Sequence, residues 1–349
     1  MGHTRRPPSS LGVTVLATAW TVVREIIIVA AFIGIATSLA RWSGNIVVAA
    51  LQLVAPLTVL ASAIIAVAAV ITGHPLLAIT GAIVVALSLP LFIPKLVPDP
   101  SRHRTGAAPM FTVALANLYF DNPEPEDAIE QLIAVDADIL VMTELSVDLL
   151  DRFDRLGGAA RYPSRIHPDP VEGEYAVGIF SQTGLEAARV EQHGDLQLIA
   201  ATWVGLEDPA ASGDDVPPGA RAVEVRAVHP DAPSTRTGFK RWRHQLRELR
   251  KLLRDLDGPA IVLGDLNAGT FQVPYERLLS RRFRDAHAVL GKAMKPSWGI
   301  APWLPRWVPT LVARLDHLVI SPEIHVHSLE DLDPVGSDHR PFRAELELR

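Results

Sequence analysis

At residues 260–268 the chain reads AIVLGDLNA, an apolar run that ends in an acid and an amide. A short apolar run with β-branched residues is typical of a buried strand. Asp265 and Asn267 then stand at the end of this strand, where a rigid sheet can hold polar side chains for chemistry. Gly264 suits either a close backbone approach or an ordinary strand end. Taken alone, the segment fits an Asx turn better than a catalytic element, so the rest of the chain must decide.

Isolated polar residues mark the ends of other predicted strands in the same way. They are Asn117 after residues 111–116, Glu144 after 139–142, His229 after 222–228, Asp316 and His317 at the start of 315–320, and Ser337-Asp338-His339 in a later loop. Each has an ordinary structural explanation as a turn or cap residue. Side chains at strand ends can converge at one rim of a sheet, and the whole set is hard to explain by chance. The pattern therefore predicts a polar site at that rim.

Strand-like and helix-like segments alternate from residue 111 to the end of the chain. Further strands are predicted at residues 175–180 and 196–203, and helices at 125–135, 148–156 and 239–256. The last helix has one apolar stripe and a run of Arg and Lys on its other side. Such a run is usually a solvated face. The alternation indicates a domain built from both strands and helices.

The composition excludes several kinds of site. The chain has 349 residues and no cysteine, so disulfides, thiolate zinc sites and cysteine nucleophiles are excluded. A metal ion must therefore be held by oxygen or imidazole. The net charge of -6 does not fit a dedicated nucleic-acid binder, although a local basic patch stays compatible with it.

The amino-terminal third predicts a membrane anchor. Residues 22–40, 46–71 and 76–92 are apolar and each approaches or exceeds the roughly 20 residues that a helical span needs. A secretory signal is the alternative for the first segment, but cleavage there would leave two more apolar segments. We expect an all-α multi-pass anchor at residues 1–96, a linker at 97–109 and a catalytic domain at 110–349. Arg and Lys flank both ends of the spans, and the working expectation is an extracytoplasmic enzyme at the cell membrane.

The strand-end motifs together resemble those of the endonuclease/exonuclease/phosphatase superfamily, closest to its membrane-anchored bacterial members. The motifs, in the order of that family, are NLY at 117–119, DILVMTE at 138–144, GIFS at 178–181, VHP at 228–230, GDLNA at 264–268, RLDH at 314–317 and GSDHRP at 336–341. The GDLNA and GSDHRP segments are the most specific. The resemblance implies an α/β (α+β) four-layer sandwich, in which two mixed β-sheets pack face to face with helices outside.

The resemblance also implies a role for each matched residue. Asn117 and Glu144 would hold a divalent ion, with Asp338 as a further ligand. The implied catalytic residues are Asp265 and Asn267, which would position the attacking water and the phosphoryl oxygens, His229, which would contact the scissile phosphate, and His339, which Asp316 would orient. The general base stays open between His339 and Asp265.

Elementary chemistry agrees with these roles. A phosphoester is an anion that repels nucleophiles, so its hydrolysis needs charge neutralisation and a positioned water. Carboxylate and carboxamide ligands suit Mg²⁺, with Mn²⁺ as the alternative ion. An Asp behind a His fixes the tautomer of the imidazole and raises its pKa.

The predicted function is a membrane-anchored, metal-dependent phosphodiesterase or phosphatase that acts on a lipid-linked or surface-accessible phosphoester, with the bilayer as partner. A tethered nuclease for DNA or RNA is the alternative, and an inactive membrane-bound scaffold is a remote one. Residues 296–312 interleave Trp298, Trp303 and Trp307 with prolines, which predicts a loop near the active-site rim. Trp298 is a candidate substrate contact, and Trp303 and Trp307 are expected to be exposed towards the membrane interface or an apolar substrate tail.

Overall fold

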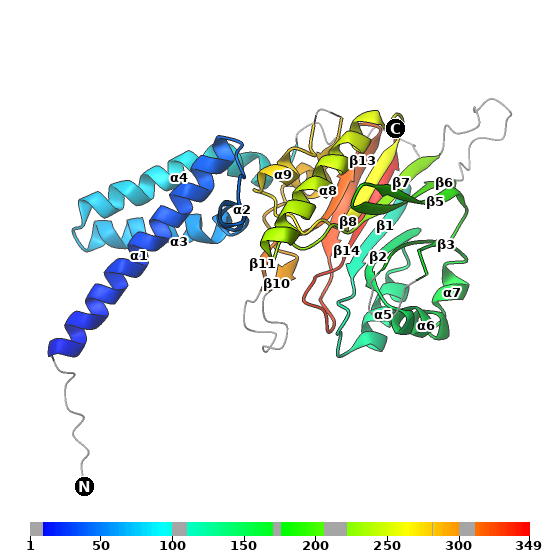
Figure 1. The fold of residues 1–349 in the computed structure, drawn as a ribbon, viewed down its shortest axis with the longest axis horizontal. Coiled ribbons are helices and arrows are strands. Elements are labelled where there is room, and N and C mark those ends of the chain that lie inside the picture. Colours follow the sequence, from blue (N-terminus) through cyan, green and yellow to red (C-terminus); the bar gives the residue numbers. More distant parts are fainter. Residues whose placement is uncertain (1–9, 100–109, 170–175, 206–221, 281, 300–310) are drawn as a thin grey trace, which may run out of the picture. The chain divides into compact units, whose positions relative to one another are not determined.

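The computed structural model describes residues 10–99, 110–169, 176–205, 222–280, 282–299 and 311–349. The chain divides into two compact units, Met1–Leu91 and Phe92–Arg349, both drawn in Figure 1. The boundary falls five residues before the expected end of the anchor at residue 96. Most of the expected linker, residues 100–109, lies outside the described residues, as do Trp303 and Trp307.

The first unit consists of apolar helices whose large side chains are widely exposed. The helices are α1 Ser10–Leu39, α2 Ile46–Leu53, α3 Ala55–Ile71 and α4 Pro75–Leu96. Thr18–Leu39 and Pro75–Leu96 are each long and apolar enough to cross a bilayer. Ile71 and Leu76 are both 79% exposed. Apolar surface of this extent indicates contact with another apolar phase, so the structure supports membrane association.

The expected middle span, residues 46–71, is broken. Helices α2 and α3 meet at an angle of 62° around Val54. Pro56 stands in the first turn of α3, where its missing N–H and fixed φ suit a helix start better than a helix interior. The described residues therefore hold two unbroken candidate spans, or up to three if the bent pair is one span.

The second unit contains two six-stranded sheets. The first has the order β13-β14-β1-β2-β4-β3 and the second has the order β5-β6-β7-β8-β12-β9. The strands of the first sheet are β1 Met110–Asn117, β2 Ile139–Leu145, β3 Ser164–Ile166, β4 Ala176–Ser181, β13 Ile324–Asp331 and β14 Phe342–Leu348. Those of the second are β5 Leu185–His193, β6 Leu196–Trp203, β7 Val223–Val228, β8 Ala260–Asp265, β9 Arg284–Asp285 and β12 Asp316–Ile320. Both sheets are mixed, because β1 pairs in parallel with β2, and β7 with β8, whereas their other pairs are antiparallel.

The two sheets pack face to face over one apolar core. Val113 and Val141 of the first sheet and Ile199, Ile261 and Leu318 of the second are all at most 1% exposed and belong to a single cluster. Each such aliphatic side chain contributes about 1.5–3 kcal/mol through its removal from water. The central strands are buried on both faces, which is why they read as continuous apolar runs in the sequence.

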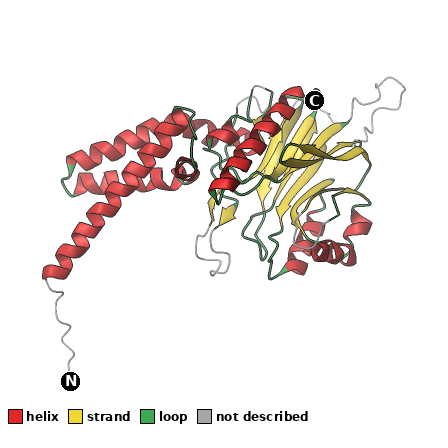
Figure 2. Cartoon of the chain, in the orientation of Figure 1, coloured by secondary structure: helices red, strands yellow, loops and turns green. Residues whose placement is uncertain are grey.

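Helices cover the outer faces of the sandwich (Figures 1 and 2). The helices of this unit are α5 Pro125–Val135, α6 Val147–Arg155, α7 Gly158–Arg161, α8 Arg236–Asp255, α9 Val273–Glu276 and α10 Ala286–Val289, and a small sheet joins β10 Trp298–Gly299 to β11 Leu311–Ala313. Leu132 of α5 and Leu149 of α6 pack on Leu140 at the outer face of the first sheet. Helix α8 lies outside the second sheet, and its Gln245 donates a hydrogen bond to the carbonyl of Asp195 beside β6. The four-layer sandwich that the resemblance implied is thus confirmed.

Candidate active site

Polar side chains from both sheets meet at one end of the sandwich. Asn117 ends β1 and Glu144 lies near the end of β2, whereas Asp265 ends β8 in the other sheet. Asp316 opens β12 and pairs directly with Asp265 across the antiparallel ladder. A hydrogen bond of 3.0 Å from Nδ2 of Asn117 to Oδ2 of Asp265 joins the two sheets. The strand-end residues Asn117, Glu144, Asp265 and Asp316 thus come together as expected, whereas His317 contacts Asp285 and the carbonyl of Ala268 instead.

Glu144 is held in a strained backbone conformation. It lies within β2, not after it as the sequence suggested, at a point where the register with β4 shifts. Its φ of 58° lies in the left-handed region, which costs a non-glycine residue on the order of 1–3 kcal/mol and is found most often at functional sites. Its carboxylate accepts hydrogen bonds from Nδ2 of Asn117 at 2.8 Å and from the backbone N–H of Phe120 at 3.0 Å. The bulge thus turns a half-buried carboxylate towards Asn117.

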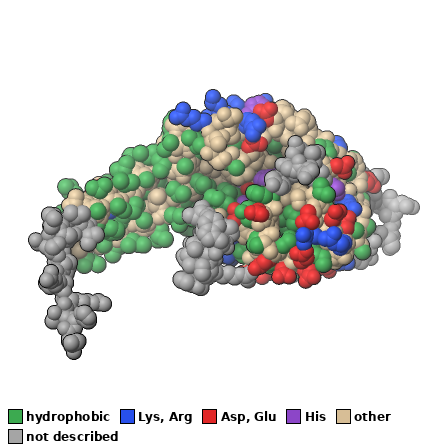
Figure 3. All heavy atoms as spheres, turned by 60° about the horizontal axis from the view of Figure 1, so that its bottom comes forward, with side chains coloured by type: hydrophobic (Ala, Val, Ile, Leu, Met, Phe, Trp, Pro, Cys, Tyr) green, Lys and Arg blue, Asp and Glu red, His purple; other side chains and the backbone are tan. Residues whose placement is uncertain are grey.

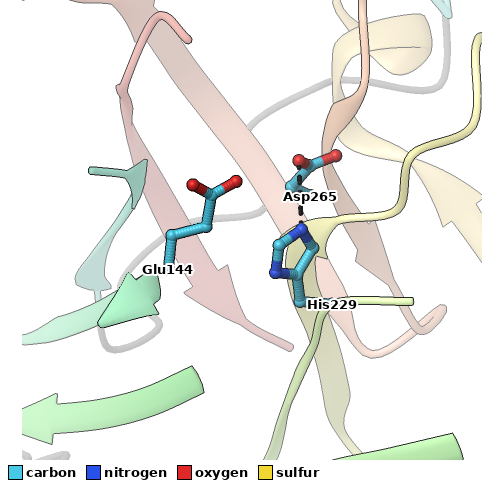
Figure 4. Close-up of side chains that lie close together, drawn as sticks. All are labelled: Glu144, His229 and Asp265. Atoms are coloured by element: carbon cyan, nitrogen blue, oxygen red, sulfur yellow. Dashed lines mark ion pairs between the residues drawn. The ribbon is translucent and has the colours of Figure 1, made fainter. Parts of the chain in front are cut away.

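Asp265 lies between two imidazoles. Its Oδ2 is 3.4 Å from Nε2 of His229 and 3.5 Å from Nε2 of His339. Figure 4 shows the His229–Asp265 pair beside Glu144. Burial opposes ionisation of Asp265, but the charge of His339 and the hydrogen bond and charge of His229 hold its pKa well below the ordinary value. The carboxylate is therefore ionised throughout the physiological range.

His339 is held by Asp316, as expected from the sequence. Nδ1 of His339 lies 2.8 Å from Oδ2 of Asp316, and both residues are buried. Burial lowers the pKa of His339, but the charge of Asp316, then that of Asp265, and the hydrogen bond to Asp316 together raise it to about 10. The imidazole is thus an imidazolium at neutral pH, with Nε2 facing Asp265.

His229 is brought to Asp265 by a close approach of β7 and β8. A Cβ on Gly264 would lie 1.8 Å from the carbonyl oxygen of Val228, so only glycine fits there and the close-approach interpretation of Gly264 is confirmed. Burial lowers the pKa of His229, but the hydrogen bond and the charge of Asp265 outweigh it and raise the pKa. Asn267, with a φ of 49°, donates from Nδ2 to the carbonyl of Pro230 at 2.9 Å, which ties the β8 turn to the segment after His229.

Asp338 and Trp298 lie together at the rim. The indole N–H of Trp298 donates to Oδ2 of Asp338 at 3.1 Å, and Trp298 is half-buried. Burial is the main cause of a raised pKa of Asp338; the charge of His339 opposes this, and the charge of Glu144 adds to it. The hydrogen bond from Trp298 and the effect of the Glu144 charge place the Asp338 carboxylate beside the acids of the site.

The structure adds Ser297, which the sequence did not single out. Its hydroxyl donates to Oδ2 of Asp316 at 2.7 Å and accepts from the backbone N–H groups of Leu315 and Asp316. Ser297 therefore fixes the carboxylate that holds His339. A lone serine beside a tryptophan carries no signal in a single sequence, because its partners are about 20 residues away.

Two groups of side chains have the composition of a metal site. The ligand atoms of Glu144, His229 and Asp265 lie within 4.8 Å of one another, and those of Asp265, Asp316 and His339 do so as well. Asn117 bridges Glu144 and Asp265. The donor set is rich in carboxylate oxygen, which fits a hard divalent cation. Asp338 belongs to neither group among the described residues.

Comparisons of sequence and of structure with known proteins indicate the same family. The sequence model of the Endonuclease/Exonuclease/phosphatase family matches residues 114–339. No curated protein sequence matches the chain significantly. Among solved structures, an endonuclease/exonuclease/phosphatase from Beutenbergia cavernae DSM 12333 is similar over 69% of this chain and 72% of its own, with 16% identity and a TM-score of 0.52.

Two further structures share the fold. D. rerio TDP2 complexed with single strand DNA product covers 68% of this chain and 99% of its own, with 14% identity and a TM-score of 0.52. The human Nocturnin catalytic domain with bound sulfate anion covers 69% and 96%, with 19% identity and a TM-score of 0.52. At such identities the likeness concerns the fold.

Proposed function

Because this chain belongs to the endonuclease/exonuclease/phosphatase family, we propose that it is a membrane-anchored phosphoester hydrolase that needs a divalent metal ion and acts on lipid-linked substrates. Membership of the family supports the general reaction, which is the hydrolysis of a phosphoester. The substrate class, the metal and the residue roles are inferred from the chain's own side chains. The observation on which the proposal rests is the ionised Asp265, buried between His229 and His339 and close to Glu144.

Glu144 and Asn117 are the proposed metal ligands, with Asp338 as a further one. The oxygen of Asn117 accepts one hydrogen bond, from the N–H of Tyr119, and keeps a second lone pair. These oxygen ligands favour Mg²⁺, with Mn²⁺ as the alternative. When bound, the ion would neutralise phosphate charge and polarise the ester.

The remaining side chains suit an anionic substrate. His229 and His339 are the proposed contacts to phosphoryl oxygens, because Asp265 raises the pKa of His229 and Asp316 keeps His339 cationic. Asp265 is the proposed acceptor of a hydrogen bond from the attacking water, which it would orient together with Asn267. Asp316 acts through His339, so it is a positioning residue. Trp298 is the proposed substrate contact at the rim.

The candidate membrane helices favour a lipid-linked phosphoester. A catalytic unit on the same chain as two apolar helices of 22 residues stays close to a bilayer, where lipid-linked esters are concentrated. The rival is a tethered nuclease, a possibility raised by D. rerio TDP2, which has a similar fold and is complexed with a single strand DNA product. The net charge of -6 weighs against nucleic acid as the main substrate.

A parallel assay tests the proposed function. The full-length protein in vesicles is given Mg²⁺ or EDTA, and a lipid-linked phosphate ester, single-stranded DNA, RNA and a sugar phosphate are compared by kcat/KM. We expect Mg²⁺-dependent hydrolysis, at least about tenfold faster on the lipid-linked ester, because the anchor concentrates enzyme and substrate on one surface. Faster cleavage of DNA or RNA would establish the rival, and no hydrolysis of any substrate would establish a scaffold.

Glu144→Gln is expected to weaken Mg²⁺ binding by about tenfold or more, because it removes one charge from a hard-cation site while keeping the side chain's shape. Titration calorimetry of the detergent-solubilised protein measures the affinity. Glu130→Gln makes the same chemical change on the exposed surface of α5 and is the matched control. Equal Mg²⁺ affinities of the wild type and Glu144→Gln would remove Glu144 from the metal site.

A further inference from the structure

Helix α8 carries a continuous row of cations along one side. Its 20 residues hold eight Lys and Arg but only two acids, in a chain whose net charge is -6. Six of the cations follow one another at intervals of three or four residues, which places them on one face of a helix. This basic stripe consists of Arg236, Lys240, Arg243, Arg247, Arg250 and Arg254. At 1.5 Å per residue it is about 27 Å long.

The adjacent side of α8 is electrically different, because its cations are paired. Arg241 forms an ion pair with Asp231 at 2.6 Å, and Lys251 forms one with Glu248 at 2.8 Å. In the basic stripe, by contrast, Arg236, Lys240, Arg247 and Arg254 form no ion pair with any carboxylate that the structure describes. The two sides of one helix therefore differ in net charge, although both are exposed.

The basic stripe concentrates like charges. Arg243 lies over the ring of Phe239, 5.5 Å from its centroid, and is partly buried. Its burial, followed by the charges of Arg247 and Arg277, lowers the pKa of its guanidinium. Like charges at this spacing destabilise a helix, and an anionic surface facing them would reverse the sign of that effect. In the view of Figure 3, one group of Lys and Arg side chains lies along the upper edge, apart from most of the Asp and Glu side chains, whereas other Lys and Arg side chains lie among the acids at lower right.

Helix α8 is also fixed to the active site. The indole N–H of Trp242, on its buried face, donates to the carbonyl of Leu266 at 3.2 Å. Leu266 stands between Asp265 and Asn267, so this bond joins the helix to the turn that carries both residues. A surface that binds the basic stripe would therefore also set the orientation of the active-site rim.

We propose that the basic stripe is a docking surface for anionic phospholipid headgroups, which holds the catalytic unit in a defined orientation on the bilayer. It rests on the membrane anchoring in the proposed function, but not on the proposed reaction. The candidate spans make a headgroup surface the anion that this unit meets most often. Clusters of four to eight Lys and Arg on an amphipathic helix are typical of binding to anionic lipid, and the stripe has this number.

Energy transfer to labelled headgroups in nanodiscs tests the proposal with the full chain. The chain has no cysteine, so a single Asp257→Cys just beyond α8 takes one donor dye, and Asp151→Cys on α6 gives the comparison position. Replacing about one third of the phosphatidylcholine by phosphatidylglycerol should raise transfer from position 257 at least about twofold, and not from position 151. Raising NaCl from about 0.1 M to about 0.5 M should abolish the rise, since salt screens exposed charges.

Two double variants provide a matched control. Lys240→Gln with Arg247→Gln removes two cations from the basic stripe, whereas Arg241→Gln with Lys251→Gln removes the same two residue types from the paired side. All four side chains are exposed, so both variants should fold. We expect the first variant to lose at least half of the phosphatidylglycerol response and the second to keep it.

Other outcomes would overturn the docking surface. One is the absence of any response to phosphatidylglycerol, and another is an equal loss of the response in the two variants. The third is binding of single-stranded DNA in neutral discs that depends on the stripe and occurs without a lipid response. This third outcome would make the stripe a nucleic-acid surface. Hydrolysis of a small soluble phosphoester in the same discs is measured in parallel. A protein that hydrolyses this ester but shows no response at position 257 contradicts the docking surface and leaves the proposed reaction standing.

Discussion

Asp316→Asn is expected to lower kcat by about three to four orders of magnitude, the loss that follows when the carboxylate behind a catalytic imidazole becomes an amide. Asp316 accepts from Nδ1 of His339 at 2.8 Å and from the hydroxyl of Ser297 at 2.7 Å. An amide nitrogen at this position would face Nδ1 as a donor and favour the wrong tautomer. It would also remove the largest favourable contribution to the imidazolium.

The measurement is kcat on a soluble phosphoester with saturating Mg²⁺. Asp151→Asn, the same change at an exposed position of α6, controls for the loss of one charge. Near-ultraviolet circular dichroism, to which the buried Trp203 and Trp242 contribute, reports whether the sandwich is intact. A folded Asp316→Asn variant with more than a tenth of wild-type kcat would show that the pair has no role in turnover.

Asp316→Asn also has a second readout in stability. The pKa of His339 is raised from its ordinary 6.5 to about 10, so protonation of this group stabilises the folded state. That contribution is fully present below pH 6.5 and is lost as the pH rises to about 10. In EDTA-treated protein the free energy of unfolding should therefore fall over this window in the wild type and fall less in Asp316→Asn. Equal slopes for the two proteins would contradict the role of Asp316 in holding the imidazolium.

The strands that carry the site could be predicted because they are buried on both faces. Ala260–Asp265 and Ile139–Leu145 are nearly uninterrupted apolar runs, so the polar residues at their ends stand out. The edge strands β5 and β13 show no such contrast between an apolar run and a polar end. Leu185–His193 is largely exposed, and only part of Ile324–Asp331 is buried, so neither has the pattern of a buried strand.

Contacts across long sequence separations explain what the sequence could not reveal. Ser297 acts on Asp316 through a bond that only the folded chain creates. The strain at Glu144 arises from a register shift between two strands, and the sequence of β2 alone places this residue after the strand. The pairing of Trp298 with Asp338 likewise depends on how strand β10 meets the loop between β13 and β14. Residue types could be predicted from pattern and resemblance, but backbone strain and supporting hydrogen bonds could not.

Asp265→Asn is expected to lower kcat by at least about 10³-fold, because groups that act as a unit lose most of their effect when one member is removed. Asp265 contacts His229, His339, Asn117 and Asn267, more of the site than any other side chain. Its charge raises the pKa of both imidazoles. The amide would remove that charge and the proposed acceptor for the attacking water.

The chain contains a matched control for this change, since Asp285 is a second buried carboxylate beside two imidazoles. Its oxygens lie 3.4 Å from His287 and 3.6 Å from His317, and the hydroxyl of Tyr275 donates to it at 2.8 Å. Burial raises its pKa, but hydrogen bonds from the two imidazoles hold it well below the ordinary value, as at Asp265. Asp285→Asn should therefore lower the unfolding temperature and change kcat by less than about tenfold, because the partners of this buried carboxylate are Tyr275, His287 and His317 and not the proposed catalytic residues. Losses of kcat of the same size in both variants would show that burial of charge, and not the position of Asp265 at the site, determines the effect.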